Sequence, residues 1–349
     1  MELAAIAPEL RQFTDVTLSF LSGGKRFRAL FCYWGWQSVT SSVDELDPFA
    51  HPSTETVLPG IVLAASALEV FHAAALVHDD IMDSSDTRRG APSAHRRFES
   101  IHREGGFRGD AAAFGRSSAL LLGDLLLGWS DELFDRGTSM LVDRAAGAAG
   151  RTEFAIMRTE VTAGQYLDIL EENAWATYPE AEALPRAHRV IVYKSAKYSV
   201  EAPLAIGAAL GGASAAQVAA LRAFGLPLGV AYQLRDDMLG VFGDPAVTGK
   251  PAGDDLVEGK RTVLVAHALE AAATADATHL DSSLGRPLDD AAIAELRRII
   301  HVSGAPAQVE ELIDSLADTA LVALAGADID EHARSVLAQL ASAATRRTV

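Results

Sequence analysis

Three acidic residues, Asp79, Asp80 and Asp83, follow a long apolar stretch of the chain. On a helix, Asp79 and Asp83 lie one turn apart on the same face, with Asp80 beside them. Carboxylates at this spacing repel one another, and the C-terminal end of a helix disfavours anions. A cation relieves both effects, and Mg²⁺ prefers oxygen ligands that it shares with substrate phosphates. The cluster therefore indicates a magnesium–phosphate site, with a solvated acidic helix end as the alternative.

A second acidic pair, Asp236-Asp237, lies on another apolar segment, which Gly243 and Pro245 bring to an end. By itself such a pair is typical of surface charge. Helical bundles, however, build metal sites from acidic side chains on facing helices. Two such clusters in one chain favour a pair of helices that hold a diphosphate and its metal ions across a cavity.

The basic residues are few, and several of them stand close in sequence to the acidic clusters. The chain has 30 basic and 47 acidic residues, for a formal net charge of −17. A flexible Gly-Gly turn precedes Lys25 and Arg28, and Arg88 and Arg89 follow Asp83 by a few residues. Guanidinium groups and helix N-termini both bind phosphate. Lys250 and Lys260 follow the second acidic pair, and their loops are equally compatible with solvated charge.

The composition excludes several classes of protein. The acidic balance argues against a nucleic-acid binder, which depends on cationic contacts to phosphate. A single cysteine, Cys32, excludes an internal disulfide and suits a reducing compartment. The first ten residues lack the pattern of a signal peptide, and the longest apolar stretch, 117–129, is too short to span a bilayer. We expect a cytoplasmic protein without a membrane span.

The elements that must position these residues are helices, because apolar residues recur at spacings of three and four. Strand-like alternation is nearly absent, and Pro59 is expected to open the helix that ends at Asp83. We expect one all-α domain over residues 1–349. The expected helices are 26–38, 59–83, 114–136, 138–171, 186–211, 214–243, 260–274, 289–303 and 306–344. The expected loops are 41–58, 84–112, 172–185, 244–259 and 275–288.

The chain resembles the trans-isoprenyl diphosphate synthases, the family of farnesyl and geranylgeranyl diphosphate synthases. The motifs that carry the resemblance are GGKRFRA, FHAAALVHDDIMDSSDTRRG, FGRSSALLLGDLLL, GQYLDI, YKSAKYSVEAPL, YQLRDDMLGVFGD and GKPAGDDLVEGKRT. The resemblance implies a bundle of long helices around a central cavity, a homodimer, and a Mg²⁺-dependent transferase. Its substrates would be isopentenyl diphosphate and an allylic diphosphate (dimethylallyl, geranyl or farnesyl).

The resemblance also implies a role for each matching residue. The residues implied to bind Mg²⁺ are Asp79 and Asp83, with Asp80 in support, and Asp236 for a further ion. Those implied to contact the allylic diphosphate are Arg88, Lys194, Gln233, Lys250 and Lys260. Those implied to hold isopentenyl diphosphate are Lys25, Arg28, His72 and Arg89. Oxygens of Ser195 and Gln233 would stabilise the carbocation formed when diphosphate departs, while exclusion of water protects it.

Two features of the sequence bear on this assignment. Gly240 stands where many members of the family carry a third acid in the second motif. In the family, bulk on the helix face before Asp79 limits the length of the product. Ala74 and Ala75 leave that face open, and Phe71 lies about 12 Å from Asp79 along a helix. This depth favours geranylgeranyl diphosphate as the product, with a farnesyl or longer-chain synthase as the alternative.

Two other functions fit parts of the pattern. A terpene cyclase also uses aspartate-rich helices and magnesium, but it takes one diphosphate substrate and has no need of the Gly-Gly-Lys-Arg turn or Arg89. A non-catalytic subunit of a hetero-oligomeric synthase is expected to lose acidic residues, and both acidic clusters are present here.

Overall fold

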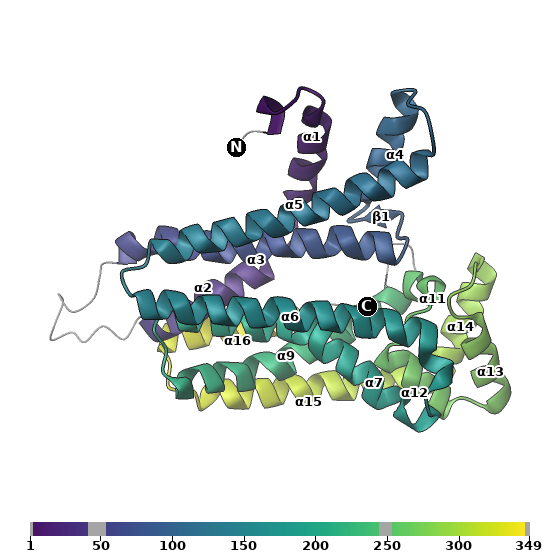
Figure 1. The fold of residues 1–349 in the computed structure, drawn as a ribbon. Coiled ribbons are helices and arrows are strands. Elements are labelled where there is room, and N and C mark those ends of the chain that lie inside the picture. Colours follow the sequence, from purple (N-terminus) through teal and green to yellow (C-terminus); the bar gives the residue numbers. More distant parts are fainter. Residues whose placement is uncertain (1–2, 41–53, 244–252, 346–349) are drawn as a thin grey trace. The chain divides into compact units, whose positions relative to one another are not determined.

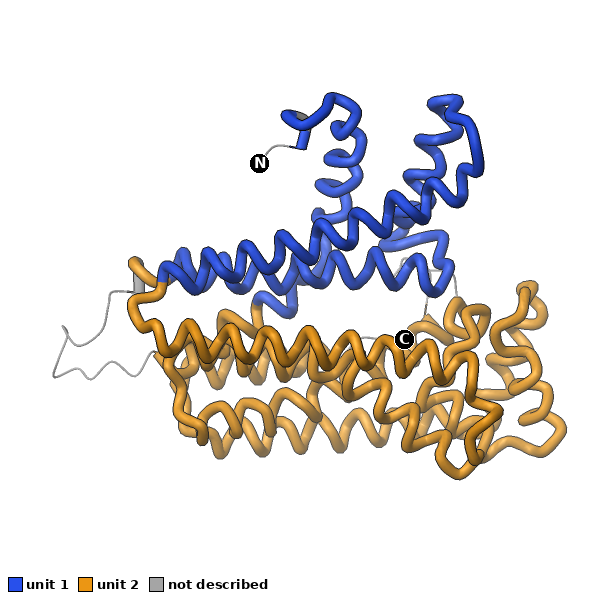
Figure 2. The backbone as a smooth tube through the Cα atoms, viewed as in Figure 1, with its two compact units in different colours: residues 1–29, 58–140 blue, residues 30–57, 141–349 orange. Residues whose placement is uncertain are grey.

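The computed structural model describes residues 3–40, 54–243 and 253–345, and nearly all of its regular structure is helical (Figure 1). Among the described residues, the strands are limited to β1 (Thr87–Arg88) and β2 (Ala91–Pro92), which form one antiparallel pair. The expected all-α class is therefore confirmed. The chain divides into two compact units, shown in different colours in Figure 2 and described separately below.

Unit 1 comprises residues 1–29 and 58–140. Its elements are η1 (Leu3–Ala5), α1 (Leu10–Leu21), most of α3 (Thr54–Met82), the β1–β2 hairpin, α4 (Ala94–Glu104) and α5 (Ala111–Ser139). Helix α3 packs closely on α5. The distance shows this: a Cβ on Gly137 would lie only 2.6 Å from the Gly60 carbonyl oxygen. The Ser130 hydroxyl also donates to the Ala67 carbonyl at 2.8 Å. This packing fixes the helix that carries the first acidic cluster.

Unit 2 comprises residues 30–57 and 141–349. Its first elements are α2 (Phe27–Thr40, which begins in unit 1), α6 (Arg144–Ala174), η2 (Trp175–Thr177), η3 (Glu180–Glu182), α7 (Ala183–Val190), the π-helix η4 (Ile191–Glu201) and α8 (Ala202–Leu210). They are followed by α9 (Ala215–Phe242), α11 (Asp254–Glu258), α12 (Val263–Ala271), α13 (Thr274–Ser283), α14 (Asp290–Val302), α15 (Ala305–Ala325) and α16 (Glu331–Thr345).

The π-helix η4 is held at close range by glycines on two long helices. A Cβ on Gly164 of α6 would lie 2.3 Å from the Lys194 amide nitrogen, and one on Gly229 of α9 would lie 2.5 Å from the Ala196 carbonyl oxygen. Only glycine permits a backbone to approach this closely. π-Helices are rare and are frequent at functional sites, so η4 marks its residues, Lys194 among them, as candidates.

The structure corrects several expected boundaries. The segment 84–112, expected to be a loop, contains the β1–β2 hairpin and α4, and the expected loop 275–288 contains most of α13. Helix α1 lies outside the expected helical ranges. Helix α3 begins at Thr54, so Pro59 lies inside the helix and does not open it. Because proline has no backbone N–H, α3 lacks one intrahelical hydrogen bond at Pro59.

By length and composition alone, three helices of the described residues could cross a membrane: Thr56–Met82, Ala111–Ser139 and Ala215–Phe242. In the structure 67% of the most apolar window of the first is buried, against 28% and 39% for the others. Two of these helices carry the acidic residues of the candidate site. The expectation that the chain lacks a membrane span stays a prediction.

Candidate active site

The first acidic cluster lies at the C-terminal end of α3. The helix ends at Met82, but the Asp83 amide donates to the Asp79 carbonyl at 2.8 Å, so the helical spacing continues through Asp83. Asp79 and Asp83 are partly exposed, whereas Asp80 is completely buried. The three carboxylates are therefore not equivalent, since Asp79 and Asp83 alone are accessible from solvent.

Arg88 lies against this cluster, as the sequence predicted. Its Nε donates to Asp80 Oδ1 at 2.8 Å, and its Nη2 lies 3.4 Å from Asp79 Oδ2. A guanidinium group at this distance offsets the repulsion between the neighbouring carboxylates. Because Asp80 is buried, this ion pair also satisfies a charge that would otherwise be costly to bury.

Arg89 sits in the tight turn between β1 and β2. Arg89 and Gly90 have φ values of 54° and 74°, as the two-residue type I′ turn of a hairpin requires. A left-handed conformation is unfavourable for arginine. The side chain is held by a hydrogen bond from its Nη1 to the Ser22 carbonyl at 3.0 Å. A Cβ on Gly24 would lie 3.0 Å from Arg89 Nη2, so a glycine there lets the guanidinium group approach.

The Gly-Gly-Lys-Arg turn is anchored to α3 by Glu69, a residue that the sequence analysis missed. Gly23, Gly24 and Arg26 all have positive φ, at 76°, 85° and 55°. Glu69 accepts a hydrogen bond from the Ala29 amide at 3.1 Å, and Arg26 Nη1 lies 3.6 Å from its other oxygen. A largely buried glutamate in an apolar helix is unusual. That anomaly is the signal by which Glu69 could have been found.

His72 lies one turn along α3 from Glu69, within the positive field of the neighbouring arginines. Its pKa is well below the ordinary value of 6.5, first because of burial and then because of Arg28, with Arg89 and Arg88 adding to the effect. The imidazole is therefore neutral at neutral pH. The same field that disfavours a protonated histidine attracts an anion.

In unit 2, the two predicted lysines that the structure describes, Lys194 and Lys260, are paired with acidic residues. Lys194 Nζ on η4 forms an ion pair with Asp168 on α6, and Lys260 Nζ lies 3.0 Å from Glu258 Oε2. Ser195 follows Lys194 and is partly buried. Asp168 belongs to the GQYLDI motif, but neither Asp168 nor Glu258 was assigned a role from the sequence. These carboxylates hold the lysines in defined positions.

The second acidic pair divides into an exposed and a buried residue. Asp236 is exposed, whereas Asp237 is 6% exposed and accepts a hydrogen bond from Gln233 Nε2 at 2.8 Å. Burial, followed by the charge of Asp255, raises the pKa of Asp237 well above its ordinary value. Asp236 is thus the residue of the pair that is open to solvent.

Asp255 occupies the space beside Gly240, where many family members carry the third acid. A Cβ on Gly240 would lie 2.0 Å from Asp255 Oδ2. Position 240 is one turn after Asp236 on the same face of α9. The first residues of α11 therefore supply a carboxylate at the place where the sequence of α9 lacks one.

The donor set suits magnesium shared with a substrate. Within the described ranges, no three His, Cys, Asp or Glu side chains are close enough together to form a complete metal site. Mg²⁺ seldom requires such a cage, because it keeps several waters and binds through one or two carboxylates together with substrate phosphates. Asp79 with Asp83, and Asp236 with Asp255, offer such incomplete sets of oxygen ligands.

The structure assigns the predicted residues to the two units as follows. Unit 1 contains Lys25, Arg28, His72, Asp79, Asp80, Asp83, Arg88 and Arg89. Unit 2 contains Lys194, Ser195, Gln233, Asp236 and Lys260. Lys250 lies outside the described residues. In each unit, cationic side chains lie beside an acidic pair, which is the arrangement that a magnesium diphosphate ligand requires.

Comparison with known proteins supports this chemistry. The model of the polyprenyl synthetase family matches residues 9–301. A short chain isoprenyl diphosphate synthase of Methanothermobacter thermautotrophicus is 33% identical over 243 residues, which are 69% of this chain and 66% of that protein. A geranylgeranyl diphosphate synthase of Mycobacterium tuberculosis is 30% identical over 305 residues, 87% of this chain and 75% of that protein.

A solved structure agrees over nearly the whole length. The geranylgeranyl pyrophosphate synthase of Corynebacterium glutamicum, crystallised with isoprenyl diphosphate and magnesium, superposes with a TM-score of 0.87 at 38% identity. The match covers 99% of this chain and 94% of that one. The chain spans somewhat less than two thirds of the archaeal short chain synthases that it matches, at 66% and 63% of their lengths. From the family match and these relatives, the chain belongs to the polyprenyl synthetase family.

Proposed function

We propose that the protein is a transferase that condenses isopentenyl diphosphate with an allylic diphosphate. The observation that carries the proposal is the placement of cations around each acidic pair: Arg88 with Asp79 and Asp80 in unit 1, and Lys260 near Asp237 in unit 2. An acidic protein that binds diphosphates must concentrate its positive charge locally. These cations suit the allylic diphosphate, and the cations around His72, Arg28 and Arg89 form a further set that suits a second diphosphate substrate.

In the proposed reaction, the bond between the allylic carbon and diphosphate breaks, and the double bond of isopentenyl diphosphate forms the new carbon–carbon bond. The proton lost afterwards passes to the released diphosphate. When bound, Mg²⁺ would supply Lewis-acid stabilisation of the departing diphosphate. Asp79 and Asp83 would hold it, Asp236 would hold a further ion, and Arg88, Lys194 and Lys260 would stabilise the developing negative charge.

Isopentenyl diphosphate is assigned to the cations of unit 1. The charges of Arg28 and Arg89 add to burial in depressing the pKa of His72. Lys25 belongs to the adjoining turn. A neutral His72 can donate a hydrogen bond to a phosphate oxygen without adding a proton that the reaction does not need. These residues would bind the second diphosphate without a metal ion.

Ser195 and Gln233 are assigned to the carbocation. Gln233 donates its amide N–H to Asp237. Its carbonyl oxygen therefore points away from that carboxylate and can face positive charge. The Ser195 hydroxyl oxygen serves the same purpose, and its position is fixed by the packing of η4 against Gly164 and Gly229.

Geranylgeranyl diphosphate is the proposed product. Two compared proteins are named geranylgeranyl diphosphate synthases, while another, from Aeropyrum pernix, is named a geranylfarnesyl diphosphate synthase. Phe71 is 5% exposed and Ala75 is partly exposed, whereas Ala74 is completely buried in the core of unit 1. Phe71 lies eight residues before Asp79, about two turns along α3. The variant Phe71→Ala should lengthen the products, and unchanged chain length would contradict the assignment.

We also propose a cytoplasmic homodimer without a membrane span. Leu120 and Leu121 on α5 are 50% and 62% exposed, and Ile156 and Tyr166 on α6 are 43% and 64% exposed. Exposed apolar residues on a helix are typical of an association surface, and homodimers are the commonest oligomers. Light scattering should give twice the chain mass for the wild type and a lower mass for Leu121→Glu.

The proposed activity is tested by incubation with Mg²⁺, labelled isopentenyl diphosphate and each allylic primer in turn. Label in a lengthened diphosphate product supports the synthase, and the preferred primer is read from the same assay. A hydrocarbon formed from the primer alone would indicate a terpene cyclase. No turnover, with activity restored by a second synthase chain, would indicate a non-catalytic subunit.

A further inference from the structure

Both arginines of the Arg-Arg-Gly motif stand on one short hairpin, whose base is joined to α4. β1 and β2 pair through Thr87 with Pro92 and Arg88 with Ala91. Below them, the Ser93 amide donates to the Asp86 carbonyl at 3.0 Å. Two paired residues per strand give little stability by themselves. The hairpin therefore needs further contacts to hold its arginines in place.

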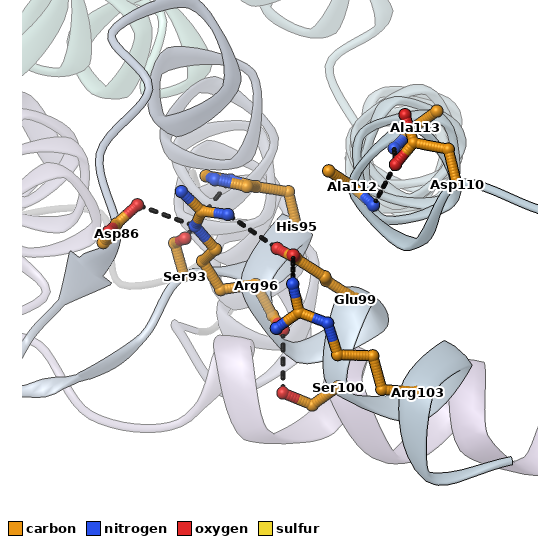
Figure 3. Close-up of polar contacts among 10 residues, drawn as sticks. All are labelled: Asp86, Ser93, His95, Arg96, Glu99, Ser100, Arg103, Asp110, Ala112 and Ala113. Carbon is orange, nitrogen blue, oxygen red and sulfur yellow. Dashed lines mark hydrogen bonds and ion pairs between the residues drawn. The ribbon is translucent and has the colours of Figure 1, made fainter. Parts of the chain in front are cut away.

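Arg96, on the first turn of α4, makes such a contact. Its Nε donates to Asp86 Oδ1 at 2.7 Å and its Nη1 donates to Glu99 Oε2 at 2.6 Å (Figure 3). One planar guanidinium group thus bridges the base of the hairpin and the body of α4. Holding two carboxylates at once fixes its orientation, which a single flexible contact would not do.

The carboxylate of Glu99, which accepts the hydrogen bond from Arg96, is held in place by burial. Its side chain is 5% exposed, although the residue lies on a highly charged helix. Helix α5 covers it, since a Cβ on Gly115 would lie 3.1 Å from Glu99 Cβ and 2.4 Å from the His95 carbonyl oxygen. The hydrogen bond from Arg96 lowers the pKa of Glu99, so the carboxylate stays ionised.

We infer that Arg96 is a positioning residue that holds the Arg88–Arg89 hairpin through Asp86. Arg88 and Arg89 must point in different directions, one to the carboxylates of α3 and the other to the Gly-Gly-Lys-Arg turn. Arg89 also keeps an unfavourable left-handed backbone, which persists only where neighbouring contacts impose it. The expected change in KM rests on the proposed function, whereas the expected change in hydrogen exchange of the hairpin does not.

Arg103 provides a matched control. It also forms an ion pair with Glu99, one turn further along α4, but no contact between Arg103 and the hairpin is seen. Arg103→Ala and Arg96→Ala remove the same charge from the same helix, and each leaves Glu99 one arginine. Only Arg96→Ala releases Asp86. A difference between the two variants therefore isolates the contact with the hairpin.

The structural test is hydrogen exchange, measured by mass spectrometry on peptides covering residues 84–93. These amides should exchange faster in Arg96→Ala and in Asp86→Ala, and as slowly as in the wild type in Arg103→Ala. The double variant Arg96→Ala/Asp86→Ala should exchange no faster than the faster single variant, as expected for residues that act through one contact. Equal exchange in Arg96→Ala and Arg103→Ala would overturn the inference, whatever the activity.

The kinetic test follows from the assignment of Arg89 to isopentenyl diphosphate. In Arg96→Ala, KM for isopentenyl diphosphate should rise about fivefold, the factor that corresponds to an exposed ion pair of about 1 kcal/mol. Arg103→Ala should change KM less than about twofold, and Arg96→Lys should recover part of the loss. A wild type that makes no product would overturn the proposed function and leave the exchange result standing. A lower melting temperature with unchanged KM would overturn the kinetic role.

Discussion

The two groups of candidate site residues differ in how the backbone holds them. In unit 1, Arg26 and Arg89 occupy turns with positive φ, and hydrogen bonds to side chains and carbonyls keep them there. In unit 2, Lys194 and Gln233 lie on helices that pack at close range through Gly164 and Gly229. Unit 1 thus depends on strained turns that are held by polar contacts. Unit 2 depends on tight steric packing. Substitutions should therefore disturb the site residues of each unit for a different reason.

The largest effect is expected when one proposed metal ligand is removed from each unit. Asp79→Asn should lower kcat by on the order of 10³-fold, and Asp236→Asn by about 10²-fold, because each removes charge stabilisation that acts in the transition state. Steady-state assays at saturating Mg²⁺ measure both effects. Asp290→Asn, at an exposed position on α14, is the control and should behave as the wild type. Full activity in either ligand variant would remove that unit from the proposed site.

Glycine substitutions should separate strain from packing. Gly164→Ala in unit 2 places a Cβ 2.3 Å from the Lys194 amide nitrogen, so it should cost about 2–3 kcal/mol of unfolding free energy through overpacking. Gly90→Ala in unit 1 meets no atom within 4 Å, but its φ is 74°. It should cost about 1 kcal/mol through backbone strain alone.

Gly128 on α5 is the control for these two variants. It is exposed, its φ is ordinary, and a Cβ there meets nothing within 4 Å. Gly128→Ala should therefore stabilise the protein by about 0.5–1 kcal/mol in urea unfolding. If Gly164→Ala were as harmless as Gly128→Ala, the account of η4 as a tightly packed segment would be wrong.

Gly240 provides a narrower test within unit 2. Gly240→Asp adds a third acid to the second acidic motif, yet the space is occupied by Asp255. We expect kcat to fall about tenfold through displacement of α11 and its neighbour Lys260. The double variant Gly240→Asp/Asp255→Gly should recover most of the activity, because it moves the carboxylate from one segment to the other. Higher activity in the single variant would contradict the occupied space.

The smallest expected effect concerns His72, whose pKa is depressed first by burial and then by the neighbouring arginines of unit 1. A histidine with a depressed pKa binds protons more readily in the unfolded state. Unfolding free energy is therefore lost as the pH falls through the histidine range, from about 7 to about 5. Denaturant unfolding should show a smaller loss over this range in His72→Gln than in the wild type. An equal dependence of unfolding free energy on pH in the two proteins would contradict the depressed pKa of His72.

The sequence predicted most of the long helices because apolar residues recur at helical spacing in them, but the expected helix 306–344 is two helices, α15 and α16. It failed for α4, where His95, Glu99 and His102 are buried and take the inward positions that apolar residues usually hold. Periodicity of apolar residues cannot detect a helix whose inner face is polar. The π-helix η4 was also not predicted, and the glycines that pack against it lie on α6 and α9, far away in sequence.

The motifs nominate the candidate site residues one by one, but they do not reveal partners that lie far away in sequence. Asp79 and Arg88 were expected to act together, and they are in contact. Glu69 contacts a residue 40 positions away, and Asp168 pairs with a lysine 26 positions away. In the sequence alone, such acids cannot be distinguished from surface charge, because their cationic partners lie far away along the chain.

The most direct test of the central claim is the ratio between diphosphate released and isopentenyl units incorporated. It is measured with purified protein, Mg²⁺, an allylic primer and labelled isopentenyl diphosphate. The account predicts one diphosphate for each unit incorporated, and no release when isopentenyl diphosphate is left out. Release from the primer alone, or release without incorporated label, would contradict it.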